Sequence, residues 1–348
     1  MTRSRSFIAT PPGASIKEQL IERGMSQKEF ATRMDLSEKH ISKLINGDVQ
    51  LTTDVAIRLE IVLGIPAQFW NNLEAIYREK LTRVEAENTM DVDEVVARQF
   101  PYNEMAKLGW VPTTRNSKEK VINLRKYFEV VELSLLDNNQ ITRIACRRLA
   151  TTKKSDLSVI AWSQQAKIEA RNVQTSSINI KGLIQVIPKI REMTLLQPME
   201  FCSPLQSLLS EYGIALIFLP HLKGSFLQGA SFIDGKKIVI GLTTRGKDAD
   251  IFWFSLFHEL AHIILGHIGQ IMGTTEEDEK KADQWAKDTL ISPIEFEKFK
   301  THNDFTESSI HAFAAQQGIA PGIVVGRLQN EGCIPFSTLN QLNTQYDI

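Results

Sequence analysis

Hydrophobic positions in the first part of the chain recur every three or four residues, in short segments separated by polar and glycine residues. This spacing is typical of amphipathic helices that bury one face. Residues that start or stop helices lie at the segment boundaries. The pattern predicts five short helices: one that ends near Gly24, and four that begin at Ser26, at Ser37, at Thr52 or Thr53, and at Pro66.

The last part of the chain adds a different pattern. The apolar run 213–219 before Pro220 predicts a buried strand, and the alternation in 230–240 about Asp234-Gly235 predicts a hairpin. A long apolar run follows, 251–265, with Asp250 expected as its helix cap. Residues 274–291 repeat small and apolar side chains every four positions, which predicts a further amphipathic helix.

The section between these parts is less informative. Helical spacing is present in 117–131, 155–173 and 180–193, and Trp162 is expected in the core. We therefore predict a mainly α protein with a small β-sheet, of class α+β. The expected domains are 1–83, a helical linker domain 84–197, and 198–348.

Composition narrows the class of protein. The chain has 348 residues, 43% hydrophobic and 23% charged, with a formal net charge of −1. These values are typical of a protein that buries a core, and they give no global charge argument for nucleic acid or membrane. Cys146, Cys202 and Cys333 are odd in number and far apart, which favours a reducing cytoplasm over disulfides. No apolar segment resembles a signal peptide or a membrane span, so we expect a cytoplasmic protein.

The strongest chemical pattern is His258-Glu259-x-x-His262 inside the apolar helical run. Histidines four apart lie on one face of a helix, so both imidazoles can reach one cation. Zn²⁺ accepts nitrogen ligands and keeps an open position when it performs chemistry. Glu259 lies beside them and can act as the base that takes a proton from water. A helix that carries two histidines by chance is the alternative.

A third ligand must come from elsewhere. Gly266 and His267 follow His262 by four and five residues, which misses the metzincin spacing by one. Glu279 lies on the buried side of the helix predicted for 274–291, and we take it as the third ligand, with Asp283 as its nearest rival. His221 and His267 are further candidates for groups beside the metal, although such histidines are more often structural.

The third predicted helix has a polar outer face. Two short helices joined by a short turn form the helix-turn-helix plan, in which the second helix meets DNA. Its polar side chains are of types that bind phosphates and base edges. The alternative is a plain helical bundle with a solvated polar face. The helix caps, the spacing of apolar residues and the polar outer face all favour the helix-turn-helix interpretation.

Several segments of the first quarter resemble the XRE-type helix-turn-helix domain of HigA-like antitoxins. They are Pro12-Gly13, 26–31, 41–47, 56–60 and Phe69-Trp70. The resemblance implies a five-helix, lambda-repressor-like domain that binds operator DNA, commonly as a homodimer. It also implies DNA contacts by Gln27, Ser37, Lys39, His40 and Lys43.

Residues 213–334 resemble the ImmA/IrrE family of zinc metallo-endopeptidases. The matching segments are 229–232, 252–262, 279–286 and 322–328. The likeness implies a zincin-like domain with Zn²⁺ held by His258, His262 and Glu279, and with Glu259 as the catalytic base. Members of the family cleave regulatory partners.

These patterns lead to two functional hypotheses. The first is a DNA-binding transcriptional regulator with a zinc-dependent endopeptidase domain that cleaves a specific regulatory protein, such as a repressor or a toxin–antitoxin partner. The second is a HigA-like antitoxin and autorepressor that neutralises a toxin by binding, with the peptidase fold as a sensor or docking body. Expected partners are operator DNA and a protein substrate or toxin, without a membrane.

Overall fold

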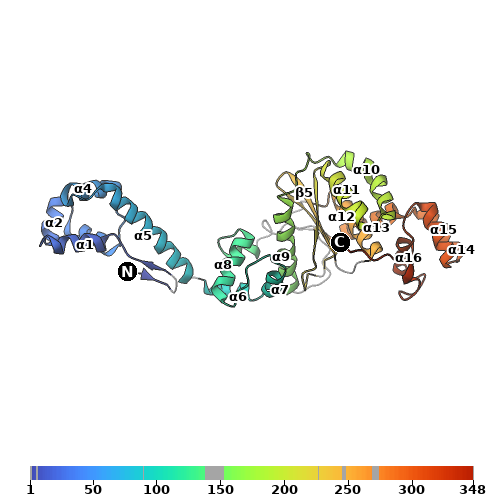
Figure 1. The fold of residues 1–348 in the computed structure, drawn as a ribbon, viewed down its shortest axis with the longest axis horizontal. Helices are drawn as coiled ribbons and strands as arrows, with labels where there is room; N and C mark the ends of the chain where they lie inside the picture. Colours follow the sequence, from blue (N-terminus) through green and yellow to red (C-terminus); the bar gives the residue numbers. More distant parts are fainter. Residues whose placement is uncertain are drawn as a thin grey trace. The chain divides into compact units, whose positions relative to one another are not determined.

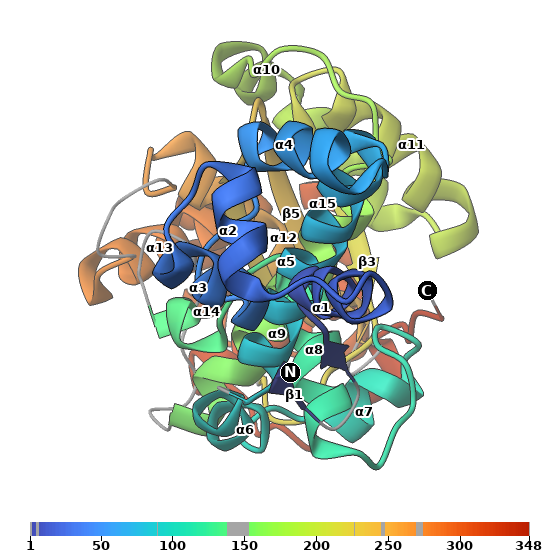
Figure 2. The ribbon, with the colours of Figure 1, turned by 90° about the vertical axis from the view of Figure 1, so that its left-hand side faces the viewer.

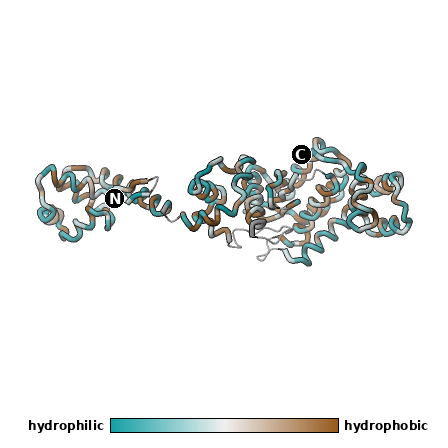
Figure 3. The backbone as a smooth tube through the Cα atoms, turned by 90° about the horizontal axis from the view of Figure 1, so that it is seen from below, coloured by the Kyte–Doolittle hydropathy of each residue, from teal (hydrophilic) through white to brown (hydrophobic). Residues whose placement is uncertain are grey.

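The chain divides into two compact units, residues 1–95 and 96–348. The computed structural model describes residues 2–4, 7–88, 90–137, 153–225, 227–244, 248–268 and 274–347. The section expected as a separate helical domain belongs, from residue 96 onward, to the second unit. Helices dominate both units, and hydrophobic and hydrophilic positions alternate along them (Figure 3).

The described residues of the first unit form five helices. A further short helix, α6 (Asp91–Ala97), follows them and spans the division between the two units. The five helices are α1 (Gly13–Glu22), α2 (Gln27–Met34), α3 (Glu38–Asn46), α4 (Thr53–Leu63) and α5 (Ala67–Asn88). Two short antiparallel strands, β1 (Thr2–Arg3) and β2 (Ile8–Ala9), pack on α5. The predicted number and order of these helices agree with the structure.

Local capping explains where the central helices begin. The hydroxyl oxygens of Ser26, Ser37 and Thr52 accept hydrogen bonds from the backbone N–H three residues ahead, at 3.1, 3.2 and 3.3 Å. Such bonds satisfy backbone donors that a helix start leaves unpaired. A left-handed Gly47, with φ of 81°, ends α3. The Glu29 carboxylate, three residues after Ser26, accepts a hydrogen bond from Arg33 at 2.7 Å.

Helices α2 and α3 lie side by side and are joined by a turn of three residues, 35–37 (Figure 2). Arg58 of α4 holds this turn by donating to the carbonyl of Met34 at 3.0 Å. The inner faces of the helices share a core that includes Phe30, Ile41 and Trp70. Packing therefore fixes α3 while its outer face remains free of the core.

The second unit is built on a three-stranded sheet of order β3-β5-β4. Strand β5 (Lys237–Thr243) is central, parallel to β3 (Ile214–Leu219) and antiparallel to β4 (Gly229–Asp234). The pairing of Asp234 with Lys237 confirms the predicted hairpin. Helix α9 (Lys153–Ala170) covers one face of the sheet and α12 (Ala249–Ile264) packs on the other (Figure 1).

Further helices surround this sheet. They are α7 (Tyr102–Lys107), α8 (Ser117–Phe128), α10 (Ile180–Glu192), α11 (Pro198–Ser210), α13 (Glu276–Leu290), α14 (Pro293–His302), α15 (Glu307–Gln317) and α16 (Pro321–Asn330), with 3-10 turns at Leu133–Asp137, Met193–Leu195 and Asn340–Leu342. Trp162 of α9 is fully buried, as predicted, and donates to the carbonyl of Pro220 at 3.1 Å.

One prediction about α12 is wrong. Asp250 was expected to cap this helix, but the cap position belongs to Asp248, and Asp250 lies in the first helical turn. Its carboxylate instead accepts a hydrogen bond from the side chain of Asn343 at 2.5 Å. Asp248 and Asp250 are two residues apart, so the sequence offers two candidates for the helix cap. In the structure Asp248 takes the cap position, and the side chain of Asp250 contacts Asn343 instead. No helix in the described ranges is long and apolar enough to cross a membrane.

Candidate metal centre

Helix α12 buries the whole His-Glu-x-x-His pattern. The exposed fractions of His258, Glu259 and His262 are 4%, 2% and 0%. This burial arises because α12 packs against the sheet, α13 and α16, whose apolar side chains cover much of its surface. Burial of uncompensated polar groups is unfavourable, so each of these side chains requires a partner.

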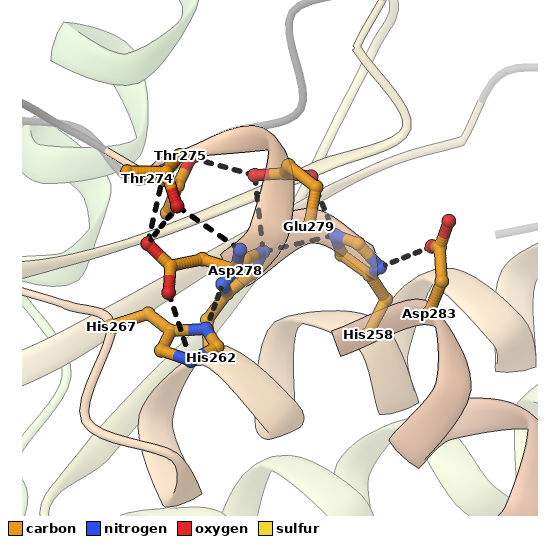
Figure 4. Close-up of polar contacts among 8 residues, drawn as sticks. All are labelled: His258, His262, His267, Thr274, Thr275, Asp278, Glu279 and Asp283. Carbon is orange, nitrogen blue, oxygen red and sulfur yellow. Dashed lines mark hydrogen bonds and ion pairs between the residues drawn. The ribbon is translucent and has the colours of Figure 1, made fainter. Parts of the chain in front are cut away.

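Helix α13 supplies the partner for both imidazoles. It packs along α12 and is capped by Thr275, whose hydroxyl accepts from the backbone N–H of Asp278 at 3.2 Å. This start places the Glu279 carboxylate over the imidazole pair (Figure 4). Thr274 steadies it by donating to Oε1 at 2.6 Å. The structure thus brings together the three residues that the sequence proposed as ligands.

The ligand atoms have the spacing that a small cation requires. One atom from each of His258, His262 and Glu279 lies within 4.8 Å of the others. The two Nε2 atoms are 3.0 Å apart, and they lie 3.3 and 3.5 Å from the Glu279 oxygens. Tetrahedral Zn²⁺ with bonds of about 2.0–2.2 Å separates its ligands by roughly 3.3 Å. The residues present therefore fit zinc.

The outer nitrogen of each imidazole has a partner of its own. Nδ1 of His258 lies 2.8 Å from Oδ1 of Asp283, and Nδ1 of His262 lies 3.0 Å from Nδ1 of His267. Because the Asp283 carboxylate only accepts, Nδ1 of His258 carries a proton, and deprotonation of Nε2, which metal binding requires, leaves the Nε2 lone pair facing inward. Partners of this kind orient metal-binding histidines.

His267 continues the chain of contacts away from His262. Its other nitrogen, Nε2, lies 3.5 Å from Oδ1 of Asp278 in the first turn of α13. A proton on this Nε2 leaves Nδ1 of His267 to accept from His262, so the second ligand also presents an inward Nε2 lone pair. Two lone pairs and a carboxylate then converge on one point, an arrangement that a cation stabilises.

The charges around the pair follow from these contacts. Burial lowers the pKa of His258, but its hydrogen bonds with Asp283 and Glu279 outweigh burial and raise the pKa to about 9. Burial raises the pKa of Glu279, whereas bonds from His258 and His262 lower it more strongly, so the net pKa is below the ordinary value. The Asp283 and Glu279 carboxylates thus favour positive charge on His258.

Glu259 occupies the side of α12 that faces the sheet. Strand β4 admits it because residue 229 is glycine: a Cβ there would lie 2.9 Å from Cγ of Glu259. Burial raises the pKa of its carboxyl, and the nearby His258 and His262 partly offset the rise. Among the described residues Oε2 of Glu259 has no hydrogen-bond partner. Buried acids with a shifted pKa occur often at catalytic sites.

Sequence reasoning considered Asp283 as a rival ligand and His267 only as a group beside the metal. The structure places Asp283 behind His258, on its outer nitrogen, and His267 behind His262. The sequence did contain a signal for the position of Asp283. Glu279 and Asp283 are four residues apart and therefore lie on the same face of one helix, toward the same imidazole. His221 is not in this cluster. Cys202 and Cys333 are free and half-buried, and Cys146 lies outside the described residues.

Four of the proposed DNA contacts lie at the start or along α3, and the fifth, Gln27, begins α2. Lys39 and Lys43 of α3, Ser37 before it, and Gln27 at the start of α2 are exposed. His40 differs, because its side chain is half-buried and Nε2 is covered without a hydrogen-bond partner among the described residues. The structure thus presents four of the five predicted contacts to solvent.

Comparisons with known proteins concern the first unit. A family model described as helix-turn-helix matches residues 16–70. An uncharacterized HTH-type transcriptional regulator, YddM of Escherichia coli (strain K12), is 38% identical over 81 residues, which are 23% of this chain and 82% of that protein. Antitoxin HigA-1 of Vibrio cholerae serotype O1 is 38% identical over 63 residues, 18% of this chain and 59% of the relative.

A solved structure is also similar in part. It is an addiction module antidote protein of a HigA family from Coxiella burnetii, 24% identical, covering 24% of this chain and 94% of that chain with a TM-score of 0.22. The capped pair α2 and α3, joined at 35–37, together with the family match defines a helix-turn-helix protein. The chain belongs, through its first unit, to the family of HTH-type transcriptional regulators.

Proposed function

We propose that this protein is a DNA-binding regulator whose second unit is a zinc-dependent endopeptidase for a specific regulatory protein. One observation carries the hydrolytic half: the convergence of His258, His262 and Glu279 at separations that suit tetrahedral zinc. Family membership of the first unit supports the DNA-binding half.

The residues divide the chemistry between them. His258, His262 and Glu279 would hold Zn²⁺, which supplies Lewis acidity toward water and a peptide carbonyl. Glu259 accepts the proton of the attacking water and passes it to the leaving amine, since its buried carboxyl has a raised pKa. Asp283 and His267 hold the imidazoles in orientation. Among the described strands, β4 lies at an edge of the sheet. It can therefore pair with an extended peptide beside Glu259.

The proposal is tested on the purified full chain. Metal analysis is expected to find one equivalent of zinc per chain. Mapping of new protein amino termini in cells that produce the protein is expected to reveal cleavage of a small number of regulatory proteins. A chain that takes up no zinc at micromolar concentration, or that generates no new termini when loaded, would contradict the endopeptidase proposal.

A second candidate function rests on the similarity to Antitoxin HigA-1. In this proposal the chain neutralises a toxin by binding it and represses its own operator, and hydrolysis is not needed. Neutralisation and repression then survive replacement of Glu259 by alanine. Loss of neutralisation in that variant, with the protein still folded, would favour the endopeptidase.

Removal of one basic side chain from α3 is expected to weaken DNA binding. Lys43→Ala should lower affinity for every sequence and reduce the slope of log K against log salt by about 1, because one phosphate contact is lost. The measurement is a salt titration on an operator selected from a random duplex pool. Lys80→Ala, an exposed lysine of α5, is the matched control and should leave the slope unchanged.

Loss of the group behind His262 is expected to weaken the metal site without removing a ligand. His267→Ala should reduce zinc affinity by about 10–100-fold, the usual cost of losing an orienting partner. Competition with a chromogenic chelator measures this affinity. His311→Ala changes an exposed histidine of α15 and serves as control. Equal affinities in the two variants would show that His267 does not orient His262.

A further inference from the structure

A cavity of about 320 Å³ opens beside the candidate metal centre. His258 and Glu259 form one end of it, together with Gly229 of β4. Its remaining walls come from α12, α13 and α16. Binding sites commonly have this concave, preformed character and begin at volumes of about 300 Å³. The cavity is therefore continuous with the reaction centre of the proposed function.

Apolar side chains form most of its walls. Phe254 and Ile251 contribute from α12, Leu290 and Ile291 from the end of α13, and Ile323 from α16. Leu290, Ile291 and Ile323 are buried and packed into the main core, so this part of the wall is fixed by the fold. A wall of this kind gains free energy when it covers an apolar ligand surface.

Two cations also line the cavity. Lys287 of α13 is half-buried, and no carboxylate among the described residues pairs with it. Arg327 of α16 is held differently: its Nε donates to Glu331 at 2.5 Å, and its guanidinium lies 4.8 Å from the centre of the Phe296 ring. Lys287 therefore lines the cavity without an ion-pair partner among the described residues, although the Asp250 and Glu259 carboxylates line the same cavity.

A second acid, besides Glu259, lines the same cavity. Asp250 lines the cavity and accepts from Asn343 at 2.5 Å. Burial raises the pKa of its carboxyl, and the bond from Asn343 offsets only part of this rise. Gly326 packs directly against Asp250, where a Cβ would lie 2.3 Å from Oδ2. The carboxylate of Asp250 is thus held by Asn343 and by close packing against Gly326 of α16.

We propose that this cavity binds a large apolar side chain of the cleaved protein, next to the scissile bond, and rejects a basic side chain. The inference rests on the proposed endopeptidase function and specifies its substrate class. Apolar walls supply the affinity, and Lys287 supplies the discrimination. The substrate segment is then an extended peptide with a residue such as Phe or Leu beside the bond that is cut.

Zinc-chelating probes test the cavity without hydrolysis. One series consists of hydroxamates of N-acetylated Gly, Leu, Phe and Lys, and a second series attaches the same residues through a malonyl hydroxamate. The two series place the side chain on opposite sides of the chelating group. Affinities for the zinc-loaded full chain are measured by calorimetry. In one series Phe and Leu are expected to bind about tenfold or more tighter than Gly, with Lys weaker than Phe.

Two variants assign the preference to the cavity. Lys287→Glu should improve binding of the Lys probe about fivefold, whereas Lys189→Glu on α10, an exposed lysine outside the cavity, should not. Ile251→Asp should remove most of the preference for Phe over Gly. Ile294→Asp makes the same change at an exposed position of α14 and should retain the preference.

The outcomes distinguish a failure of the proposed side-chain preference from a failure of the proposed endopeptidase function. Equal affinity for Gly, Leu and Phe in both series would overturn the inference while zinc loading and cleavage remain intact. An apolar preference that Ile251→Asp leaves unchanged would overturn it as well. Failure of the chain to bind zinc would overturn the endopeptidase function, and the inference with it.

Discussion

Replacement of His262 by alanine is expected to abolish stoichiometric zinc binding. His262 is fully buried, and its Nε2 lies 3.0 Å from Nε2 of His258 and 3.5 Å from Glu279. Removing a ligand should cost more than the roughly 100-fold that loss of an orienting partner costs. Chelator competition on the purified full chain measures the change.

A second variant guards against the effect of simple unfolding. Glu279→Gln keeps the size of a side chain that is only partly buried, but it removes the negative charge that faces the imidazoles. It should also lose zinc affinity, while His311→Ala should not. Zinc should raise the melting temperature of the wild type and of the control but not of the two ligand variants, because only a bound ion shifts the folding equilibrium. One equivalent of tightly bound zinc in both ligand variants would place the metal elsewhere.

The sequence predicted the helices of the first unit well because their signals are local. Ser26 and Ser37 accept the bonds that start α2 and α3, and Gly47 ends α3 in the left-handed region. The Asp234–Lys237 pairing followed from the alternation of two adjacent strands. Each of these features depends on residues within a few positions of one another, so a pattern along the chain suffices.

The cluster of candidate metal ligands was partly predictable for the same reason. The spacing of His258 and His262 on one helix is a local property, and the placement of Glu279 on the buried side of α13 anticipated its contact. The role of His267 could not be predicted from the sequence. It depends on how the chain after α12 folds back, so that Nδ1 of His267 meets Nδ1 of His262. Asp250 shows the same limit, because Asn343, far along the chain, determines what its carboxylate contacts.

The division of the chain and the cavity depend on packing between distant segments. Trp162 of α9 donates to the carbonyl of Pro220, directly after β3, and this bond ties the middle section to the sheet of the second unit. The cavity needs α12, α13, α16 and β4 at once. No periodicity within one segment encodes such an arrangement, so only the folded structure places Lys287 and Ile323 beside Glu259.

Replacement of Glu259 by glutamine is expected to stop hydrolysis while the metal stays bound. The amide has nearly the same shape, so packing against Gly229 is retained, but it cannot accept a proton. Loss of a positioned base typically lowers a rate by about 10²–10⁴-fold. The rate of cleavage of a substrate found by amino-terminus mapping measures the effect, alongside zinc content and operator affinity.

Comparison with a matched variant makes the Glu259→Gln result specific to the reaction. Glu277→Gln makes the same chemical change at an exposed position in the first turn of α13 and should cleave at the wild-type rate. Glu259→Gln should keep one zinc and full affinity for DNA, because Glu259 is not in the ligand cluster and lies outside the first unit. A Glu259→Gln protein that cleaves as fast as the wild type would assign the proton transfer to another group, whereas one that loses zinc would make Glu259 part of the metal site.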